Sequence, residues 1–258
     1  MPSRCRRAVR ISALAGAALL ASAALSGCGT TDADSAAPEE KTFSVSGHEL
    51  VVDSDNSAIE LLPASGGGKD MKVTRRFDGW ALGGSAGVSW EMTDGKTLKL
   101  RMRCKGITVG CEAKHRIEVP RGVAVTVKDR NGAIEARGFE TALKVDADNG
   151  AVDVRDSSGP LELSTSNGQI TAEGIRSRKV SATTSNGAIR IAAQQVPDRI
   201  ETRSDNGATR ITVPRAGYKV VTGSGNGRTK VDVPRDDASG HTVTARSGNG
   251  AIDIRTGG

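Results

Sequence analysis

Val180–Ile191 reads VSATTSNGAIRI, and this stretch decides the fold because close copies of it recur along the second half of the chain. Each copy is centred on an Asn-Gly pair, and successive pairs lie 18, 18, 19, 20, 20 and 23 residues apart. The asparagines are Asn131, Asn149, Asn167, Asn186, Asn206, Asn226 and Asn249. A period of about 20 residues is typical of stacked repeat architectures, in which each unit completes its core by lying on its neighbours.

Apolar and polar residues alternate on both sides of each Asn-Gly pair. The position six residues before the Asn holds Val125, Leu143, Leu161, Val180, Ile200, Val220 and Val243. The position three residues after it holds Ile134, Val152, Ile170, Ile189, Thr209, Thr229 and Ile252. Two residues before the Asn, the column narrows to Asp129, Ala147, Thr165, Thr184, Ser204, Ser224 and Ser247. Alternation with period two predicts a half-buried strand on each side of the turn.

The Asn-Gly pair itself predicts a tight turn, because Asn and Gly tolerate the positive φ that a two-residue bend between strands demands. The opposite corner of each repeat is longer and irregular, as at Val213-Pro214-Arg215, so we expect insertions at that edge only.

Two architectures fit this pattern: an antiparallel meander closed into a barrel or sandwich, and a two-sheet parallel solenoid with coils about 4.8 Å apart. Like side chains recur in every coil, and tight turns occur at one end only, which favours the solenoid. We therefore predict an all-β fold: a two-sheet parallel β-solenoid, or β-helix, with coils of 18–23 residues.

A degenerate coil and an irregular segment precede the regular repeats. Around Asn56-Ser57, the inward offsets hold Leu50, Val52, Ile59 and Leu61. Strand-like runs follow at Met71–Phe77, Val88–Met92 and Leu98–Arg103, with the turn Asp94-Gly95 between the last two. A solenoid needs an atypical unit over its open end. We expect residues 42–120 to form the first coil and this cap, and residues 121–258 the regular coils.

Both tryptophans, Trp80 and Trp90, fall in the expected cap. One interpretation is a surface on which sugar rings stack. The other is cap core, which we favour because Trp is highly buried on average.

The N-terminus predicts export. Four arginines within residues 4–10 precede an Ala- and Leu-rich run over residues 11–24, which is short for a spanning helix. The run ends in Leu25-Ser26-Gly27-Cys28, which resembles a bacterial lipobox. That resemblance implies a signal peptide over residues 1–27 and a diacylglyceryl group on Cys28, hence a cell-membrane location on the extracytoplasmic face. An ordinary secretory signal is the alternative. The polar residues 28–41 are expected to be a flexible tether.

The remaining cysteines predict one disulfide. Cys5 leaves with the signal peptide and Cys28 takes the lipid, so Cys104 and Cys111 are left in an exported chain. Metal binding by this pair with His115 is the competing interpretation, although the spacing is poor for it.

Charge argues against nucleic acid as a partner. The formal charge is +6, but four of the 36 basic residues belong to the signal peptide, which leaves 32 against 30 acidic residues. One column is basic: Arg190, Arg210 and Lys230 occupy the position four after the Asn in consecutive repeats. Three stacked cations would bind envelope anions such as teichoic acid or phospholipid headgroups. The alternative is a solvated face neutralised by Glu201 and Asp232.

Catalytic motifs are absent from the sequence: there is no Ser/His/Asp arrangement, GxSxG, HExxH or phosphate-binding loop. Residues 146–150 faintly resemble a calcium loop but lack its closing glutamate. We expect no enzymatic activity, no cofactor and no metal.

The recurring (S/D)-N-G-x-(I/V) turns, the run Ile117–Gly122 (IEVPRG) and the lipobox together resemble the DUF4097-type adhesin candidates of bacterial envelopes. The resemblance covers about residues 40–258 and implies a surface-exposed β-solenoid with no catalytic residues to transfer. The expected function is an adhesin-like binding or scaffold module, whose partner is a cell-wall polymer or a surface protein. A polysaccharide-acting β-helix enzyme and a structural envelope protein without a small ligand are the alternatives.

Overall fold

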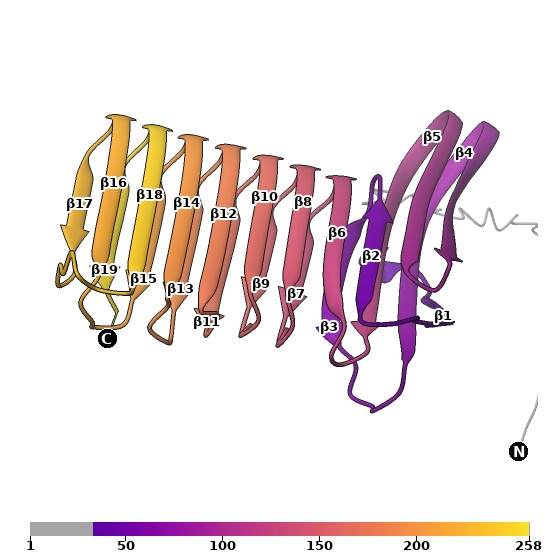
Figure 1. The fold of residues 1–258 in the computed structure, drawn as a ribbon. Helices are drawn as coiled ribbons and strands as arrows, with labels where there is room; N and C mark the ends of the chain where they lie inside the picture. Colours follow the sequence, from indigo (N-terminus) through magenta and orange to yellow (C-terminus); the bar gives the residue numbers. More distant parts are fainter. Residues whose placement is uncertain (1–32, 258) are drawn as a thin grey trace, which may run out of the picture. The chain divides into compact units, whose positions relative to one another are not determined.

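The computed structural model describes residues 33–257 and, within them, is built of β-strands and one 3-10 turn, η1 (Ala33–Ser35) (Figure 1). The strands of the cap and first coil are β1 (Glu39–Ser44), β2 (Glu49–Ser54), β3 (Ala58–Pro63), β4 (Asp70–Thr93) and β5 (Thr97–Val119). The regular coils comprise β6 (Ala124–Asn131), β7 (Ile134–Arg137), β8 (Leu143–Asn149), β9 (Val152–Arg155), β10 (Leu161–Asn167), β11 (Ile170–Ile175), β12 (Lys179–Asn186), β13 (Ile189–Ala193), β14 (Arg199–Asn206), β15 (Thr209–Val213), β16 (Lys219–Asn226), β17 (Thr229–Asp232), β18 (Thr242–Asn249) and β19 (Ile252–Thr256).

The predicted parallel solenoid is confirmed. Strands before the Asn-Gly corner pair in parallel as a first face, and strands after it pair in parallel as a second face. The register is that of the sequence columns, with Asn131 opposite Asn149 and Val125 opposite Leu143. The two faces enclose one continuous core, to which the inward columns contribute most of the buried aliphatic side chains. A Leu-to-Ala change in such a core costs about 2–5 kcal/mol.

The order of coils in space differs from their order in the chain at the C-terminal end. The last coil, β18–β19, lies between β14–β15 and β16–β17, because β18 pairs with both β14 and β16. The coil β16–β17 is therefore the outermost one, and its inward positions are only half buried or exposed. The nine residues 233–241 between β17 and β18 carry the chain back across this outer coil.

The cap at the other end is a long antiparallel hairpin of β4 and β5, joined at Asp94 and Gly95, which both have positive φ (54° and 61°). The start of β5 pairs in parallel with β2 and its end with β3, so β5 covers the outer side of the first coil on both faces. The expected cap and its strand-like runs are thus confirmed, fused into two strands. The strand β1 pairs with the outer edge of β4.

The hairpin carries an insertion at the tight corner, contrary to the expectation that insertions occur at the wide corner only. At this corner, three residues, 55–57, join β2 to β3. In β5, by contrast, residues 101–113 separate the part that pairs with β2 from the part that pairs with β3. A two-stranded ribbon therefore extends past the Asn-Gly ends of the neighbouring strands, at the top of Figure 1.

The prediction of a flexible tether over residues 28–41 is wrong for residues 33–41. Residues 28–32 lie outside the described residues, but residues 33–41 are structured, as η1 and as the first part of β1. Burial of Ala33 and strand pairing from Glu39 onward contradict a flexible segment there.

The Asn-Gly corner is built differently from the hairpin turn that the sequence predicts. The only non-glycine residues with positive φ in residues 33–257 are Asp94, Cys111 and Asp156, so the corner asparagines do not use that conformation. Their amides instead form a ladder from coil to coil, in which each Nδ2 donates to the next Oδ1 over 2.7–3.1 Å. Glycine is required for close approach: a Cβ on Gly168 would lie 1.9 Å from the carbonyl oxygen of Gly150.

A second ladder runs just inside the corner. The hydroxyls of Thr165, Thr184, Ser204, Ser224 and Ser247 each donate to the carbonyl oxygen of a corner glycine in the adjacent coil, at 2.9–3.2 Å. Each bond satisfies a buried polar group that would otherwise be costly.

Candidate functional site

A groove crosses the outer surface of the first face. It has a volume of about 610 Å³ and runs along the first residues of β2, β6, β8, β10, β12 and β14. Six strands at a spacing of about 4.8 Å give it a length of about 24 Å. The hollow forms because small side chains, Ala124, Ala142 and Pro160, occupy the column seven residues before the Asn in three successive coils. The sequence columns contained this signal, but we did not predict the groove from it.

The groove is lined mainly by apolar surface, with charged side chains along its length. Lys144 and Glu162 form an ion pair beside the small residues. Glu49 lies at the end next to the cap, whereas Lys179 and the ion pair of Arg199 with Glu201 lie toward the other end. Exposed ion pairs contribute little to stability, so these charges are free to exchange partners with a ligand laid along the strands.

The predicted column of three cations is wrong in its geometry. Arg190 and Arg210 are adjacent, as expected, but the last coil places Asp253 between Arg210 and Lys230. The carboxylate lies 3.6 Å from Arg210 Nε and interrupts the like charges that would otherwise repel.

Acidic side chains continue the same column toward the cap. Glu60, Glu135 and Asp153 follow one another there. Glu60 pairs with Arg116, and Asp153 accepts two bonds of 2.9 Å from Arg155. This pairing is typical of a solvated charged face.

The bend of the β4–β5 ribbon exposes a cluster of large apolar side chains, which we call the ribbon tip. It consists of Trp80, Leu82, Ile107 and Val109, exposed by 57, 58, 69 and 55%. The pairs Trp80–Val109 and Leu82–Ile107 lie directly opposite each other across the two strands. Their side chains therefore share one face of the ribbon.

The two tryptophans thus differ in environment. Trp90 fits the expected cap core: it packs against the core, contacts the Phe43 ring edge-on with centroids 6.4 Å apart, and has the Arg75 guanidinium 4.3 Å from its ring centroid. Trp80 contradicts that expectation, because the ribbon at its position has left the solenoid.

A bulge is what turns the β5 residues of the tip outward. Ala113, His115 and Ile117 point inward, and simple alternation would bury Val109 and Ile107 as well. The register shifts between the pairs Asp78–Glu112 and Gly79–Gly110, where Cys111 has a φ of 84°. The extra residue reverses the alternation. Period-two reasoning therefore missed the tip.

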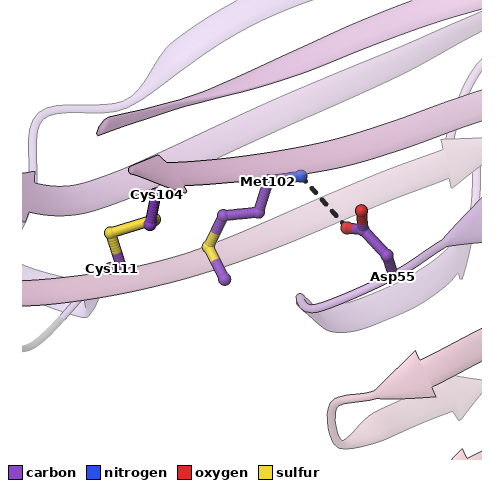
Figure 2. The surroundings of a disulfide bond; sticks show 4 residues. All are labelled: Asp55, Met102, Cys104 and Cys111. Atoms are coloured by element: carbon purple, nitrogen blue, oxygen red, sulfur yellow. Dashed lines mark hydrogen bonds between the residues drawn. A yellow bond between two sulfur atoms is a disulfide. The ribbon is translucent and has the colours of Figure 1, made fainter. Parts of the chain in front are cut away.

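The predicted disulfide is confirmed. Cys104 and Cys111 are joined across the bend, with Cα atoms 6.5 Å apart (Figure 2). Below the bend, the backbone N–H of Met102 donates to Asp55 Oδ1 at 3.0 Å, which ties the ribbon to the corner of the first coil. The bond leaves no free thiol pair to bind metal with His115.

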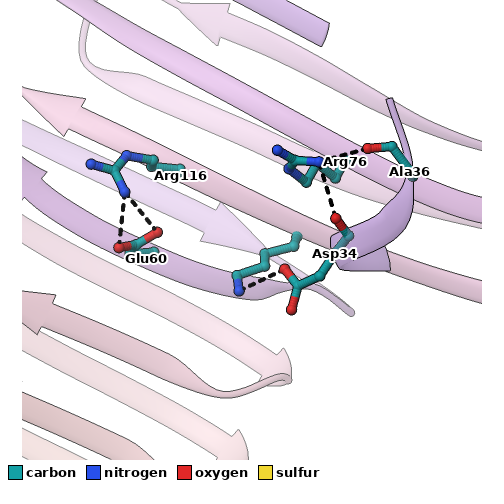
Figure 3. A network of polar contacts seen from close by, with 6 residues as sticks. Asp34, Ala36, Glu60, Arg76 and Arg116 are labelled. Carbon is teal, nitrogen blue, oxygen red and sulfur yellow. Dashed lines mark hydrogen bonds and ion pairs between the residues drawn. The ribbon is translucent and has the colours of Figure 1, made fainter. Parts of the chain in front are cut away.

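The segment before β1 is held against the same ribbon (Figure 3). Arg76 Nη1 donates to the carbonyl oxygens of Asp34 and Ala36 at 3.1 and 2.7 Å. Lys114 Nζ lies 2.8 Å from Asp34 Oδ1, and this contact raises the pKa of Lys114 and lowers that of Asp34. Arg76 and Lys114 face each other across the strands, so the contact is made on one outer face.

Two buried ionisable groups lie near the cap and have no hydrogen-bond partner for their side chains among the described residues. Burial raises the pKa of Asp129 to about 6; Asp55 and Asp148 add to the rise, and the nearby Ser54 hydroxyl and Arg130 backbone N–H oppose it without reaching hydrogen-bond geometry. Burial, reinforced by Arg75, lowers the pKa of His115 to about 4. Asp129 occupies the position at which five other coils place a Thr or Ser hydroxyl. An ionised carboxylate cannot donate the hydrogen bond that those hydroxyls donate.

Within residues 33–257, no group of three or more His, Cys, Asp or Glu side chains is arranged to hold a metal ion. In the same range, no helix is long and apolar enough to cross a membrane. Cys28 lies outside the described residues.

Comparison with known proteins supports the architecture. A family model described as toastrack DUF4097 matches residues 107–256, more than half of the 258-residue chain. The chain belongs to the DUF4097 toastrack family. None of the curated proteins is significantly similar to it in sequence.

Solved structures similar to this toastrack chain come from bacteria. A candidate adhesin of Bacteroides fragilis is 13% identical, with a TM-score of 0.54 over 85% of this chain and 97% of that one. A candidate adhesin of Parabacteroides distasonis is 12% identical, with a TM-score of 0.47 over 85% and 98%. A candidate cell-adhesion protein of Clostridium sporogenes is 15% identical, with a TM-score of 0.38 over 86% and 100%. At such identity, the Bacteroides structure shows a shared fold.

Proposed function

We propose that this toastrack chain is a lipid-anchored, extracytoplasmic binding module of the bacterial cell envelope and is not an enzyme. The groove on the first face carries the proposal. It is open along about six parallel strands, which suits an extended polymer, such as a cell-wall glycan or a strand of a surface protein, better than a compact substrate.

Three further observations support it. The lipobox-like run ending at Cys28 supports a membrane anchor. The Cys104–Cys111 disulfide is of a kind that persists in oxidising compartments outside the cytoplasm. The solved relatives of similar fold are described as adhesin candidates.

The experiment is a pull-down of the chain from residue 29 onward against purified cell-wall fractions. This portion contains all nineteen strands and the whole core, so it folds as a unit. Ala142→Arg fills the groove where small side chains line it. We expect this variant to weaken retention roughly tenfold, the effect of losing about 1.4 kcal/mol of binding free energy. Thr183→Arg is the matched control, because Thr183 is exposed on the same face but outside the groove. Equal retention of both variants would contradict the groove as the binding site.

Arg190 and Arg210 form a second, smaller part of the proposal, as an anion-binding pair on the second face, with Lys230 beyond Asp253. Their adjacency without an intervening acid favours it. Reversing both charges should abolish retention on teichoic acid; unchanged retention would remove this part and leave the groove untouched.

A further inference from the structure

We infer that the ribbon tip is a membrane-docking element, which places Trp80, Leu82, Ile107 and Val109 in the interface of the lipid bilayer. The inference rests in part on the proposed anchor at Cys28, but the tip has an apolar face of its own that is tested separately.

The composition of the tip is that of an interfacial element. Its four large side chains lie on one face and are all more than half exposed. Trp is favoured at the boundary between headgroups and acyl chains, while Leu, Ile and Val gain by entering hydrocarbon. A sugar-binding surface would instead combine a flat ring with convergent hydrogen-bonding groups. Here Leu82 and Val109 flank Trp80 toward the bend, and Asp78 is its polar neighbour along β4.

Charge at the tip complements an anionic lipid surface. Between residues 79 and 87 and between residues 103 and 111, the only charged side chains are Arg103 and Lys105, and the acidic pair Asp78 and Glu112 lies just outside, on the side of the solenoid. Basic side chains beside an apolar face add electrostatic attraction to anionic headgroups, worth about 1 kcal/mol each near the surface.

The position of the tip relative to the proposed lipid agrees with docking. Arg76 and Lys114 hold residues 34 and 36 on the outer face of the ribbon, four strand residues from Trp80, which is about 13 Å. Cys28 precedes Ala33 by five residues, a span of at most about 18 Å. The lipid and the tip can therefore reach the same bilayer, and a second contact strengthens attachment by a lipid.

The bend is also held in shape before it meets a membrane. The two strands stay paired on both sides of it, and the disulfide joins Cys104 to Cys111 across it. A Cβ on Gly84 would lie 1.8 Å from the carbonyl oxygen of Lys105, so the strands meet closely where the ribbon folds over. A preformed tip loses little conformational freedom on docking.

The fluorescence of Trp80 reports directly whether the tip enters a lipid bilayer. Trp90→Phe leaves Trp80 as the only tryptophan of the chain. The protein from residue 29 onward, without lipid, is mixed with vesicles of phosphatidylethanolamine and phosphatidylglycerol, some carrying brominated acyl chains. We expect a blue shift of Trp80 emission, quenching by the brominated lipids, and weaker partitioning into phosphatidylcholine vesicles.

Two variants test whether the exposed apolar side chains of the tip cause the partitioning into vesicles. Leu82→Ser together with Ile107→Ser removes exposed apolar groups only and should reduce partitioning roughly tenfold or more. Val221→Ser, at an exposed apolar residue of β16, is the matched control and should leave partitioning unchanged. Unchanged melting temperatures would confirm that all variants fold.

Three outcomes would overturn the inference: Trp80 emission unaffected by vesicles; reversible dimers in sedimentation that the Leu82/Ile107 variant abolishes, which would make the tip an interface between copies; or a response of Trp80 to cell-wall polysaccharide and not to lipid. The anchor is tested apart from these by the mass of the mature N-terminal peptide. An unmodified Cys28 would remove the proposed anchor while vesicle binding by the tip still stood or failed alone.

Discussion

Replacing Asp129 by Thr should stabilise the protein. Asp129 is buried in the hydroxyl column with no hydrogen-bond partner for either carboxyl oxygen among the described residues. Thr is nearly the same size, and Thr165 and Thr184 occupy the equivalent positions of other coils, each donating to a corner carbonyl. In the variant, the acceptor would be the carbonyl oxygen of Ser57, against which Gly132 packs as the corner glycines pack on one another.

The size of the gain follows from the pKa of Asp129, which burial raises from 3.8 to about 6. Each pKa unit is about 1.4 kcal/mol, so ionised Asp129 lowers stability at pH 7 by up to about 3 kcal/mol. The new hydrogen bond adds about 1 kcal/mol. Allowing for relaxation, we expect about 2 kcal/mol, or a rise in melting temperature of about 4–8 °C for a domain of this size.

The direction in which the stability penalty changes with pH makes the test specific to Asp129. Asp129 is protonated in the folded protein below about pH 6 and in the unfolded chain only below about pH 4, so its penalty is present above pH 6 and disappears as pH falls toward 4. Thermal melts should therefore show a large gain in melting temperature for Asp129→Thr at pH 7 and a small gain at pH 4. Asp146→Ser, at an exposed position, is the control and should stay within about 0.5 kcal/mol. No gain at pH 7, or equal gains at both pH values, would refute the reasoning.

Three further predictions concern the cap and the order of coils. Burial lowers the pKa of His115 to about 4, so its contribution to stability is complete above pH 6.5 and is lost as pH falls toward 4; His115→Leu should remove that acid loss in urea titrations, and an unchanged pH slope would contradict it. Reducing the Cys104–Cys111 bond should destabilise the ribbon by about 2–3 kcal/mol and speed tryptic cleavage at Lys105 without unfolding the coils, whereas equal cleavage in both redox states would mean that the bond does not constrain the bend. Cysteines at Arg203 and Arg246, which are direct neighbours, should form a disulfide, and cysteines at Arg203 and Gly223 should not; the reverse pattern would show that the coils stack in chain order.

The regular part of the fold could be predicted from the sequence because the same local rule repeats in each coil. Val125, Leu143 and their equivalents point inward in register, and the structure pairs them as the columns do. The disulfide was also predictable, since only two cysteines remained after the signal peptide and the lipobox were set aside.

The order of the last coils was not predicted, because both carry the same columns: Val220 matches Val243, and Ser224 matches Ser247. The distinguishing signal is weaker. Ile252 is aliphatic where the outer coil has Thr229, and the more apolar coil gains more by lying inside the stack. The position of Asp253, and hence the interruption of the cation column, follows from this order.

The exposure of the ribbon-tip side chains could not be predicted from the alternation of apolar and polar residues, for a different reason. A single bulge residue reverses the face on which every later residue of a strand lies. Glycines at 106 and 110 mark the irregular backbone, and both have positive φ (92° and 78°), but the sequence does not say which residue is the extra one.

The proposed function depends most on where the chain is held in the cell. The direct measurement is the mass of the N-terminal peptide of the mature protein, purified from bacterial membranes, with Cys28→Ala as the comparison. The account predicts a peptide that begins at Cys28 and carries a diacylglyceryl group, and loss of membrane retention in the variant. An unmodified N-terminus at another residue, with Cys28→Ala retained in the membrane like the parent, would contradict it.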